Sequence, residues 1–361
     1  MTLSISVFVP LYNHERFIRA TLASALQQTL PPNEILVIDD GSSDGSVMAA
    51  NAISHHTIRM IEEKINLGGT ATMLGLSYCR GDAVAILNSD DTWEANKLER
   101  QVEYLSKAKN CGVVFTLVNL IDEHGNPWKD GTNRHQSLFE VANKDRLAWL
   151  RYFFHSGNAF CASSAMVRSV CFEDLGVLDG RYIQLQDLDM WVRVALAGYD
   201  IHVVEERLTN YRLARDGANM SLGSSRNQAI YTVEYARLLR NYWSIRSLDE
   251  LVKIFPDIIV SEHADDSLVL FYLARHAAAQ PALHHRLFAL ETMAKWGGNL
   301  EAMRLAASCE GFTHVAYRDF LARWPIKEAL IFGLRQKAQE MLGKVLRYDL
   351  QQRLKTFVLG R

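Results

Sequence analysis

Two adjacent carboxylates, Asp90 and Asp91, follow a short apolar run over residues 83–87 and limit the folds open to this chain. Such a run, bounded by turn residues, is typical of a buried parallel strand, so the two acids should lie at its carboxyl end. In an open α/β sheet, ligands bind along that edge, and paired carboxylates there suit a divalent cation that also holds substrate phosphates. The alternative is a solvated turn that caps a helix beginning near Trp93, and the pair by itself does not decide between the two.

The N-terminal part of the chain alternates between strand and helix patterns. Strands are predicted over residues 5–9, 34–38, 58–61 and 83–87, with helices over 17–26, 47–53 and 70–79. This alternation predicts a mostly parallel sheet with right-handed crossovers. Asp39 and Asp40 end the second predicted strand, so the two acidic loops should meet at one edge of the sheet although they are far apart in sequence.

The character of the chain changes near residue 225. Before that point, the patterns predict helices over 93–107, 146–154 and 187–197, strands over 112–119, 165–167, 201–204 and 208–211, and a polar loop over 129–137. After it, strand signals disappear, and helices are predicted over 231–242, 267–279, 281–295, 300–307 and 326–358. The pattern therefore predicts an α/β domain over 1–225 and an α-helical C-terminal region over 226–361.

Composition excludes several classes of protein. The chain has 361 residues, of which 48% are hydrophobic and 22% charged, as in a soluble globular protein of about two domains. A formal net charge of -2 gives no signature of nucleic-acid binding. The five cysteines form no CxxC pair, so buried reduced thiols in a cytoplasmic protein are expected rather than a zinc site or disulfides. No signal peptide is expected, and the longest apolar runs are too short to span a bilayer.

Five ordered motifs carry a resemblance. They are Val7-Phe8-Val9-Pro10-Leu11-Tyr12-Asn13, Ile38-Asp39-Asp40-Gly41-Ser42-Ser43-Asp44, Asn66-Leu67-Gly68, Asn88-Ser89-Asp90-Asp91 and Gln186-Asp187-Leu188-Asp189-Met190-Trp191-Val192-Arg193. Together they resemble family 2 glycosyltransferases, which have the GT-A (Rossmann-like) fold and use nucleotide-diphosphate sugars. Tyr211-Arg212 with Asn219-Met220-Ser221 resembles the end of that catalytic domain. The resemblance covers roughly residues 3–222 and implies a nucleotide-sugar half over 1–107 and an acceptor half over 108–225.

The resemblance implies a base pocket behind the first strand. Asp40 would accept a hydrogen bond from the nucleotide base, typically from uracil N3–H, and Pro10, Leu11 and Tyr12 would line the pocket. A carboxylate at a strand end suits a ring N–H donor, and a neutral base can stack on an aromatic face. For Tyr12, a place in the core is the alternative reading.

The resemblance also implies a metal site that contacts the donor diphosphate. Asp90 and Asp91 would hold Mg²⁺ or Mn²⁺, with Asp91 the more direct ligand, and Asn66 and Gly68 would complete the donor-binding residues. The metal would neutralise charge that develops on the leaving nucleotide diphosphate. Asn88 stands where the family often has an Asp, so metal binding would depend on the other two acids. The segment after the glycine turn also lacks the Arg and Asn that are usual there, which leaves the donor unidentified.

Asp187 is the implied general base. Inverting glycosyl transfer needs one carboxylate beside the acceptor hydroxyl, and Gln186 stands where the family often has a Glu, so Asp187 is the sole candidate in that dipeptide. Its alternative reading is a helix N-cap. We expect Asp189 to be structural and Trp191 to lie in the core.

The sequence therefore predicts an inverting, metal-dependent glycosyltransferase of hexosyltransferase type, with a UDP-sugar favoured as donor. The acceptor would be a glycan or lipid-linked hydroxyl, in bacterial surface polysaccharide synthesis. Two other readings stay open. One is a sugar nucleotidyltransferase, although residues 10–14 lack the glycine-rich basic loop usual there. The other is a non-catalytic scaffold of the same fold.

The C-terminal segment over residues 326–361 has an amphipathic pattern. Eight basic residues stand against three acidic ones, an excess of five positive charges, and apolar residues recur every three or four positions. Such a helix can lie on an anionic membrane surface. The alternative is a helix that packs on its own chain or in a homodimer.

Overall fold

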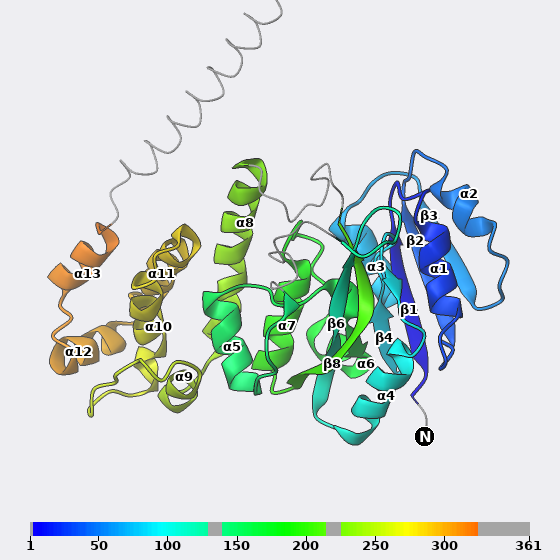
Figure 1. The fold of residues 1–361 in the computed structure, drawn as a ribbon. Helices are drawn as coiled ribbons and strands as arrows, with labels where there is room; N and C mark the ends of the chain where they lie inside the picture. Colours follow the sequence, from blue (N-terminus) through cyan, green and yellow to red (C-terminus); the bar gives the residue numbers. More distant parts are fainter. Residues whose placement is uncertain (1–2, 129–138, 214–224, 324–361) are drawn as a thin grey trace, which may run out of the picture. The chain divides into compact units, whose positions relative to one another are not determined.

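The structure is a computed structural model that describes residues 3–128, 139–213 and 225–323 (Figure 1). The predicted loop over 129–137, the motif at 219–221 and the amphipathic segment over 326–361 lie outside the described residues. No helix in the described ranges is long and apolar enough to cross a bilayer.

Eight strands form one sheet in the order β3-β2-β1-β4-β7-β6-β8-β5. The strands are β1 (Ile5–Leu11), β2 (Glu34–Asp40), β3 (Ile58–Glu63), β4 (Ala83–Ile86), β5 (Thr92–Trp93), β6 (Cys111–Ile121), β7 (Met166–Arg168) and β8 (Asp200–Arg212). The first four strands pair in parallel, which confirms the predicted β-α-β order. The apolar runs of β1, β2 and β4 are buried on both faces, whereas β3 at the edge of the sheet is only partly buried.

The second half makes the sheet mixed. β7 lies between β4 and β6 and is antiparallel to both, while β6 and β8 are parallel. The helix predicted from Trp93 is wrong at its start, because Thr92 and Trp93 pair with β8 and the helix begins at Lys97. The two strands predicted over 201–211 are one long strand, because its pairing with β6 continues through register shifts.

Helices cover the sheet (Figure 1). Those of the first 213 residues are α1 (Ile18–Leu26), α2 (Ser46–Asn51), α3 (Gly69–Ser77), α4 (Lys97–Lys107), α5 (Arg146–His155), α6 (Ser169–Leu175) and α7 (Gln186–Leu196). Helix α3 packs closely on β1 at Gly75, where an added Cβ would lie 2.3 Å from the Phe8 ring. A side chain there would push the helix off the sheet, so this glycine allows the close packing of α3 on β1.

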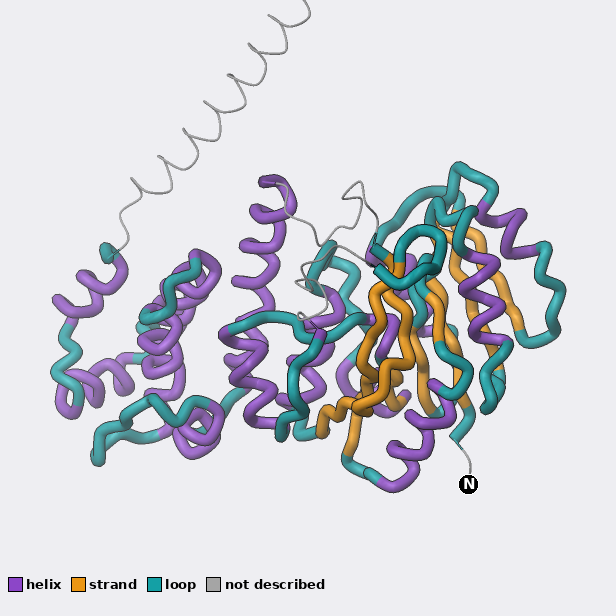
Figure 2. The backbone as a smooth tube through the Cα atoms, viewed as in Figure 1, coloured by secondary structure: helices purple, strands orange, loops and turns teal. Residues whose placement is uncertain are grey.

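Among the described residues after Arg212, helices are the only regular elements (Figure 2). They are α8 (Ser225–Leu238), α9 (Leu248–Ile254), α10 (Val269–Ala278), α11 (Leu283–Trp296), α12 (Leu300–Cys309) and α13 (His314–Leu321), with a 3₁₀ helix η3 (Leu239–Ser244). Contacts divide the chain into two compact units, residues 1–260 with 265–292 and residues 261–264 with 293–361. Helix α8 begins where the helical region was predicted to start, and a self-contained domain over 1–225 stays a prediction.

The helices that follow α8 in the first unit extend its core. Phe154 of α5 is fully buried, and its ring contacts those of Tyr242, Phe255 and Phe288 at centroid distances of 5.2, 4.8 and 6.3 Å. In the second unit, Trp296 packs edge-on against Phe312 at 5.9 Å. The aromatic contacts to α5 tie the helical region to the α/β part of the same unit.

Candidate active site

The loops after β1, β2 and β4 meet at one edge of the sheet, as predicted. In the sheet register Leu11 pairs with Asp39. The loop after β1 bridges its neighbours, because Asn13 N–H donates to Ser42 Oγ at 2.9 Å and His14 Nδ1 lies 2.8 Å from Ser89 Oγ. The two acidic pairs therefore share one edge because three parallel strands end there.

The first acidic pair holds the glycine turn. Asp40 accepts the N–H groups of Leu67 and Gly68 at 2.6 and 2.8 Å, one on each carboxylate oxygen. Asp39 Oδ2 accepts from Ser42 N–H at 3.0 Å. Its Oδ1 is buried and has no hydrogen-bond partner among the described residues. The unpaired acceptor of this pair thus belongs to Asp39, whereas Asp40, the predicted base reader, already binds two main-chain donors.

The second acidic pair is divided between a buried and a more accessible carboxylate. Asp91 is fully buried, and its two oxygens accept from Ser163 Oγ at 2.5 Å and from Arg212 N–H at 2.8 Å. Asp90 is only partly buried. Burial raises the pKa of both carboxyl groups, and the charge of Asp90 raises that of Asp91 further. The two negative charges repel each other in a poorly solvated place.

Polar side chains from distant segments fix this loop. Thr21 Oγ1 contacts the carbonyl oxygens of Ser89 and Asp91 at 2.9 and 2.8 Å. Arg212 Nε donates to the carbonyl of Asp90 at 2.6 Å. Sequence reasoning missed Ser163 and Thr21, because neither belongs to a motif and both reach the loop only through the fold. The helix-capping reading of the pair is wrong, since α4 begins at Lys97 with Asn96 as its N-cap residue.

The acidic pair fits a divalent cation shared with phosphate. No group of three or more His, Cys, Asp or Glu side chains within the described ranges is placed to hold a metal ion. The described part of the site therefore offers two carboxylates, which is what Mg²⁺ uses when substrate phosphates supply other ligands. The charge of Asp90 raises the pKa of Asp91. A cation bound between the two carboxylates would relieve this repulsion.

Asp187 lies in the first turn of α7, where Leu185 is the N-cap residue, so the N-cap reading of Asp187 is wrong. Its Oδ2 accepts from Asn158 Nδ2 at 2.7 Å and its Oδ1 from Leu188 N–H at 2.7 Å. The side chain keeps partial exposure. Burial of the carboxyl group nevertheless raises the pKa of Asp187 to about 6, against the lowering effect of both hydrogen bonds. Asn158, in the loop after α5, was not singled out as a site residue, and no local sequence signal marks it.

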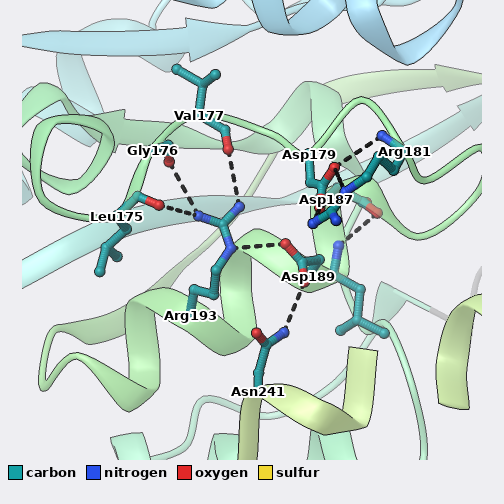
Figure 3. Close-up of polar contacts among 10 residues, drawn as sticks. Leu175, Gly176, Val177, Asp179, Arg181, Asp187, Asp189, Arg193 and Asn241 are labelled. Carbon is teal, nitrogen blue, oxygen red and sulfur yellow. Dashed lines mark hydrogen bonds and ion pairs between the residues drawn. The ribbon is translucent and has the colours of Figure 1, made fainter. Parts of the chain in front are cut away.

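Asp189 points away from Asp187 into a separate network (Figure 3). It binds Arg193 Nε at 2.8 Å and Asn241 Nδ2 at 2.8 Å. The guanidinium of Arg193 also donates to the carbonyls of Leu175, Gly176 and Val177. These bonds join α7 to the chain before it and to η3. Asp189 thus makes the contacts expected of a structural residue. Trp191 is buried, as expected, and packs edge-on against Phe115 at 4.9 Å.

The other residues predicted to bind the nucleotide-sugar donor lie partly in the core and partly at the surface. Leu11 is 1% exposed and packs in the core, so only its main chain can face a ligand. Tyr12 is 44% exposed, which excludes its core reading, and Pro10 is partly buried. Asn66 is exposed, and Gly68 has a φ of 58°, a conformation that favours glycine.

The glycine turn and the segment before Asp187 pack directly on each other. A Cβ on Gly69 would lie 2.9 Å from the carbonyl oxygen of Gly180, and one on Gly180 would lie 3.0 Å from Thr70. Only glycines allow this approach of two main chains. The candidate base segment is thereby placed against the turn that Asp40 holds, a contact that no sequence motif predicted.

The mixed sheet with its flanking helices has the GT-A architecture. Residues 6–168 match the family model "Glycosyl transferase family 2". The chain thus carries a family 2 glycosyltransferase domain, which confirms the resemblance and the predicted fold class.

Known proteins with similar sequences bear glycosyltransferase names. An uncharacterized glycosyltransferase of Rickettsia felis is 28% identical over 210 residues, covering 58% of this chain and 34% of that protein. A putative teichuronic acid biosynthesis glycosyltransferase, TuaG of Bacillus subtilis, is 28% identical and covers 62% of this chain and 83% of its own length. This chain spans about a third of the length of the Rickettsia relatives.

A solved structure supports the fold alone. S. aureus TarS 1–349 in complex with UDP-GlcNAc is 17% identical, with a TM-score of 0.54 and coverage of 88% of this chain and 89% of that one.

Proposed function

We propose that this protein is an inverting glycosyltransferase that moves a sugar from a nucleotide-diphosphate sugar, with a UDP-sugar favoured, to a hydroxyl of a glycan or lipid-linked acceptor. One observation carries the proposal. The glycine turn held by Asp40 packs, through Gly69 and Gly180, on the segment that leads into Asp187. A desolvated carboxylate thus stands beside a strand edge that carries two further acidic loops, as sugar transfer to a hydroxyl requires.

On the donor side, we assign the nucleotide to the edge formed by the loops after β1 and β2. The exposed ring of Tyr12 offers a stacking face for the base. Asp39 supplies the unpaired buried acceptor, which suits a ring N–H donor. Asp40 then acts by holding the glycine turn through the N–H groups of Leu67 and Gly68, and Asn66 and Gly68 of this turn are assigned to the donor.

For the diphosphate, we assign Asp90 and Asp91 to hold Mg²⁺ or Mn²⁺. When bound, the cation supplies neutralisation of the charge that develops on the leaving diphosphate. Because both oxygens of Asp91 already accept hydrogen bonds, the partly exposed Asp90 is the better direct ligand. Asp91 then acts by holding the loop in place and adding negative charge.

Asp187 is assigned as the general base that takes the proton from the acceptor hydroxyl as the bond to the sugar forms. A base works best when its pKa lies near the working pH, and burial brings the pKa of Asp187 to about 6. Asn158 orients the carboxylate through a hydrogen bond to Oδ2. In an inverting transfer this base stands on the sugar face opposite the leaving diphosphate.

Two other functions stay open to the same test. A nucleotidyltransferase would release pyrophosphate from a nucleoside triphosphate and a sugar phosphate, whereas a scaffold would turn over no donor. Purified protein is incubated with UDP-, GDP- and TDP-sugars, with and without Mn²⁺, and free nucleotide diphosphate is measured. A parallel reaction holds nucleoside triphosphates and sugar 1-phosphates, and pyrophosphate is measured. We expect nucleotide diphosphate to be released from one class of sugar donor. This release should require both the metal and Asp187. Pyrophosphate release, or no turnover together with no nucleotide binding by calorimetry, contradicts the proposal.

We further propose that the protein is cytoplasmic and meets its acceptor at the inner face of the membrane, in bacterial surface polysaccharide synthesis. The named function of TuaG supports the pathway class. The basic amphipathic pattern over 326–361 supports the location. Sedimentation with anionic and neutral vesicles tests it, and we expect salt-sensitive binding to anionic vesicles that is lost when residues 326–361 are removed. Equal recovery in the supernatant with both vesicles favours packing within the chain or a homodimer.

A further inference from the structure

A buried carboxylate from the helical region binds the main chain just before the candidate base. Glu234 of α8 is 6% exposed. Its Oε1 accepts the N–H of Ile183 at 2.6 Å, and its Oε2 accepts those of Gln184 and Leu185 at 2.9 and 3.1 Å. Three successive amides thus point at one side chain that lies about fifty positions further along the chain. A carboxylate that accepts several N–H groups makes strong, charge-assisted hydrogen bonds.

The three amides lie at the amino end of α7. Leu185 is the N-cap residue of this helix, and Asp187 is its second residue. The amides at a helix start lack partners within the helix, and negative charge there is favourable. Of the three amides bound by Glu234, that of Leu185 belongs to the helix start, and those of Ile183 and Gln184 belong to the chain just before it. The side chain of Leu185 is apolar and offers no acceptor, so the carboxylate comes from α8. The position and direction of the first turn of α7, and with it Asp187, depend on that contact.

Neighbouring residues of α8 and η3 also contact α5, the loop after it, and α7. Tyr235 donates from its hydroxyl to the carbonyl of Phe153 in α5, and the loop after α5 carries Asn158. A Cβ on Gly157 would lie 3.0 Å from the Tyr231 hydroxyl, so α8 packs directly on that loop. Asn241 binds Asp189 two residues after the base (Figure 3). The helical region therefore contacts the residues around both the candidate base and its hydrogen-bond partner.

We propose that Glu234 is a positioning residue for Asp187, which sets the start of α7 and makes the helical region part of the catalytic unit. This inference rests on the proposed function. Glu234 does not touch the reacting atoms. It acts through three main-chain amides, and a glutamine in its place would present an NH₂ group to at least one of those donors.

The test uses the full-length variant Glu234→Gln, with Glu291→Gln as the matched control. Glu291 is a half-exposed residue of α11. Its ion pair with Arg240 at 2.7 Å joins α11 to η3, and neither partner of the pair belongs to α7. Hydrogen exchange of residues 183–185 is measured in both variants, together with kcat, the donor KM and the pH profile of kcat. If Glu234→Gln does not fold, Glu234→Asp, which keeps the charge but withdraws it by one methylene, takes its place.

For Glu234→Gln we expect at least tenfold faster exchange at residues 183–185, a kcat at least tenfold lower and a donor KM within twofold of wild type. The acidic limb of the pH profile should move to lower pH, because water would reach Asp187 and remove the desolvation that raises its pKa. A merely structural role would lower the folded fraction and leave that limb in place.

Two results overturn the inference. One is wild-type exchange at residues 183–185, whatever the activity. The other is faster exchange with an unchanged kcat and pH profile. If wild-type protein turns over no donor at all, the proposed function fails separately, and the exchange measurement still decides whether Glu234 holds the start of α7.

Discussion

At the scale of residues, Asp90 and Asp91 look alike in sequence and differ in structure. Asp91 is fully buried, and each of its carboxylate oxygens accepts a hydrogen bond. Asp90 is partly exposed. Loss of a buried carboxylate that accepts hydrogen bonds lowers the stability of the fold. Substitutions at Asp91 and at Asp90 should therefore differ in their effect on stability. The prediction that Asp91 is the more direct metal ligand stays untested, and this geometry favours Asp90.

Asp90→Asn should abolish most transfer while leaving the protein as stable as wild type. Asp91→Ala should abolish transfer and also lower the free energy of unfolding by about 1–3 kcal/mol, because it leaves the Ser163 hydroxyl and the Arg212 N–H without their buried acceptor. Denaturant unfolding and donor turnover of both variants are the measurements. Equal stability of the two variants contradicts the division of roles, and near-normal turnover of Asp90→Asn removes that residue from the donor site.

Asp187 should set the pH dependence of transfer. A base must be deprotonated to act, so kcat should rise about tenfold per pH unit below the pKa of about 6 and level off above it. Asp187→Asn should lower kcat by roughly 10²-fold or more, flatten this limb and leave the donor KM within twofold. Steady-state rates between pH 4.5 and 8 check both statements. A collapse of donor affinity in the variant would make Asp187 a donor-site residue instead.

At the scale of elements, α7 is fixed by charged and polar side chains on both sides of its first turn. Glu234 binds the amides that precede it. Within the helix, Asp189 and Arg193 form an ion pair with side chains 4% and 18% exposed. The guanidinium then binds three carbonyls of the chain that leads away from α6. A helix held in this way can present one carboxylate in a constant direction.

Arg193→Met should lower the free energy of unfolding by about 3–5 kcal/mol, because it leaves Asp189 as a buried charge without its partner. Arg181→Met is the control. Its ion pair with Asp179 is made by a side chain that is 74% exposed, so its loss should cost less than about 1 kcal/mol. Urea unfolding of the two variants makes the comparison. Similar losses in both would show that the buried pair has no special weight in holding α7.

At the scale of the whole molecule, the helical residues 225–260 and 265–292 belong to the same compact unit as the sheet and extend its core. Tyr242 donates from its hydroxyl to the carbonyl of Leu150 at 2.6 Å, and Phe154 is covered by aromatic rings from η3, the end of α9 and α11. Without those rings, a large apolar surface on α5 would face water. Full burial of one aromatic side chain stabilises by about 1.5–3 kcal/mol.

Removal of residues 226–361 should therefore give an insoluble or inactive protein, through loss of both the aromatic cover on α5 and Glu234. Removal of residues 324–361 alone should leave donor hydrolysis within about twofold of wild type. Expression yield, thermal unfolding and donor turnover of the two truncated proteins are compared. A stable and active protein ending at residue 225 would show that the helical region is accessory and would count against its structural role.

The sequence by itself determined the four parallel strands, the meeting of both acidic loops at one edge, and the class of enzyme. Each depends on local signals, namely apolar runs of strand length, the turn residues that end them and five short motifs in order. Only the tertiary structure decided which acid of the second pair is the more buried, which acid of the first pair has an oxygen without a hydrogen-bond partner among the described residues, and which side chains hold Asp187. Ser163, Asn158 and Glu234 reach the site from segments 29 to 72 positions away from the residues they bind, and no local pattern encodes such contacts. A carboxylate's role depends on its hydrogen-bond partners and its desolvation, and both arise only when distant parts of the chain pack together.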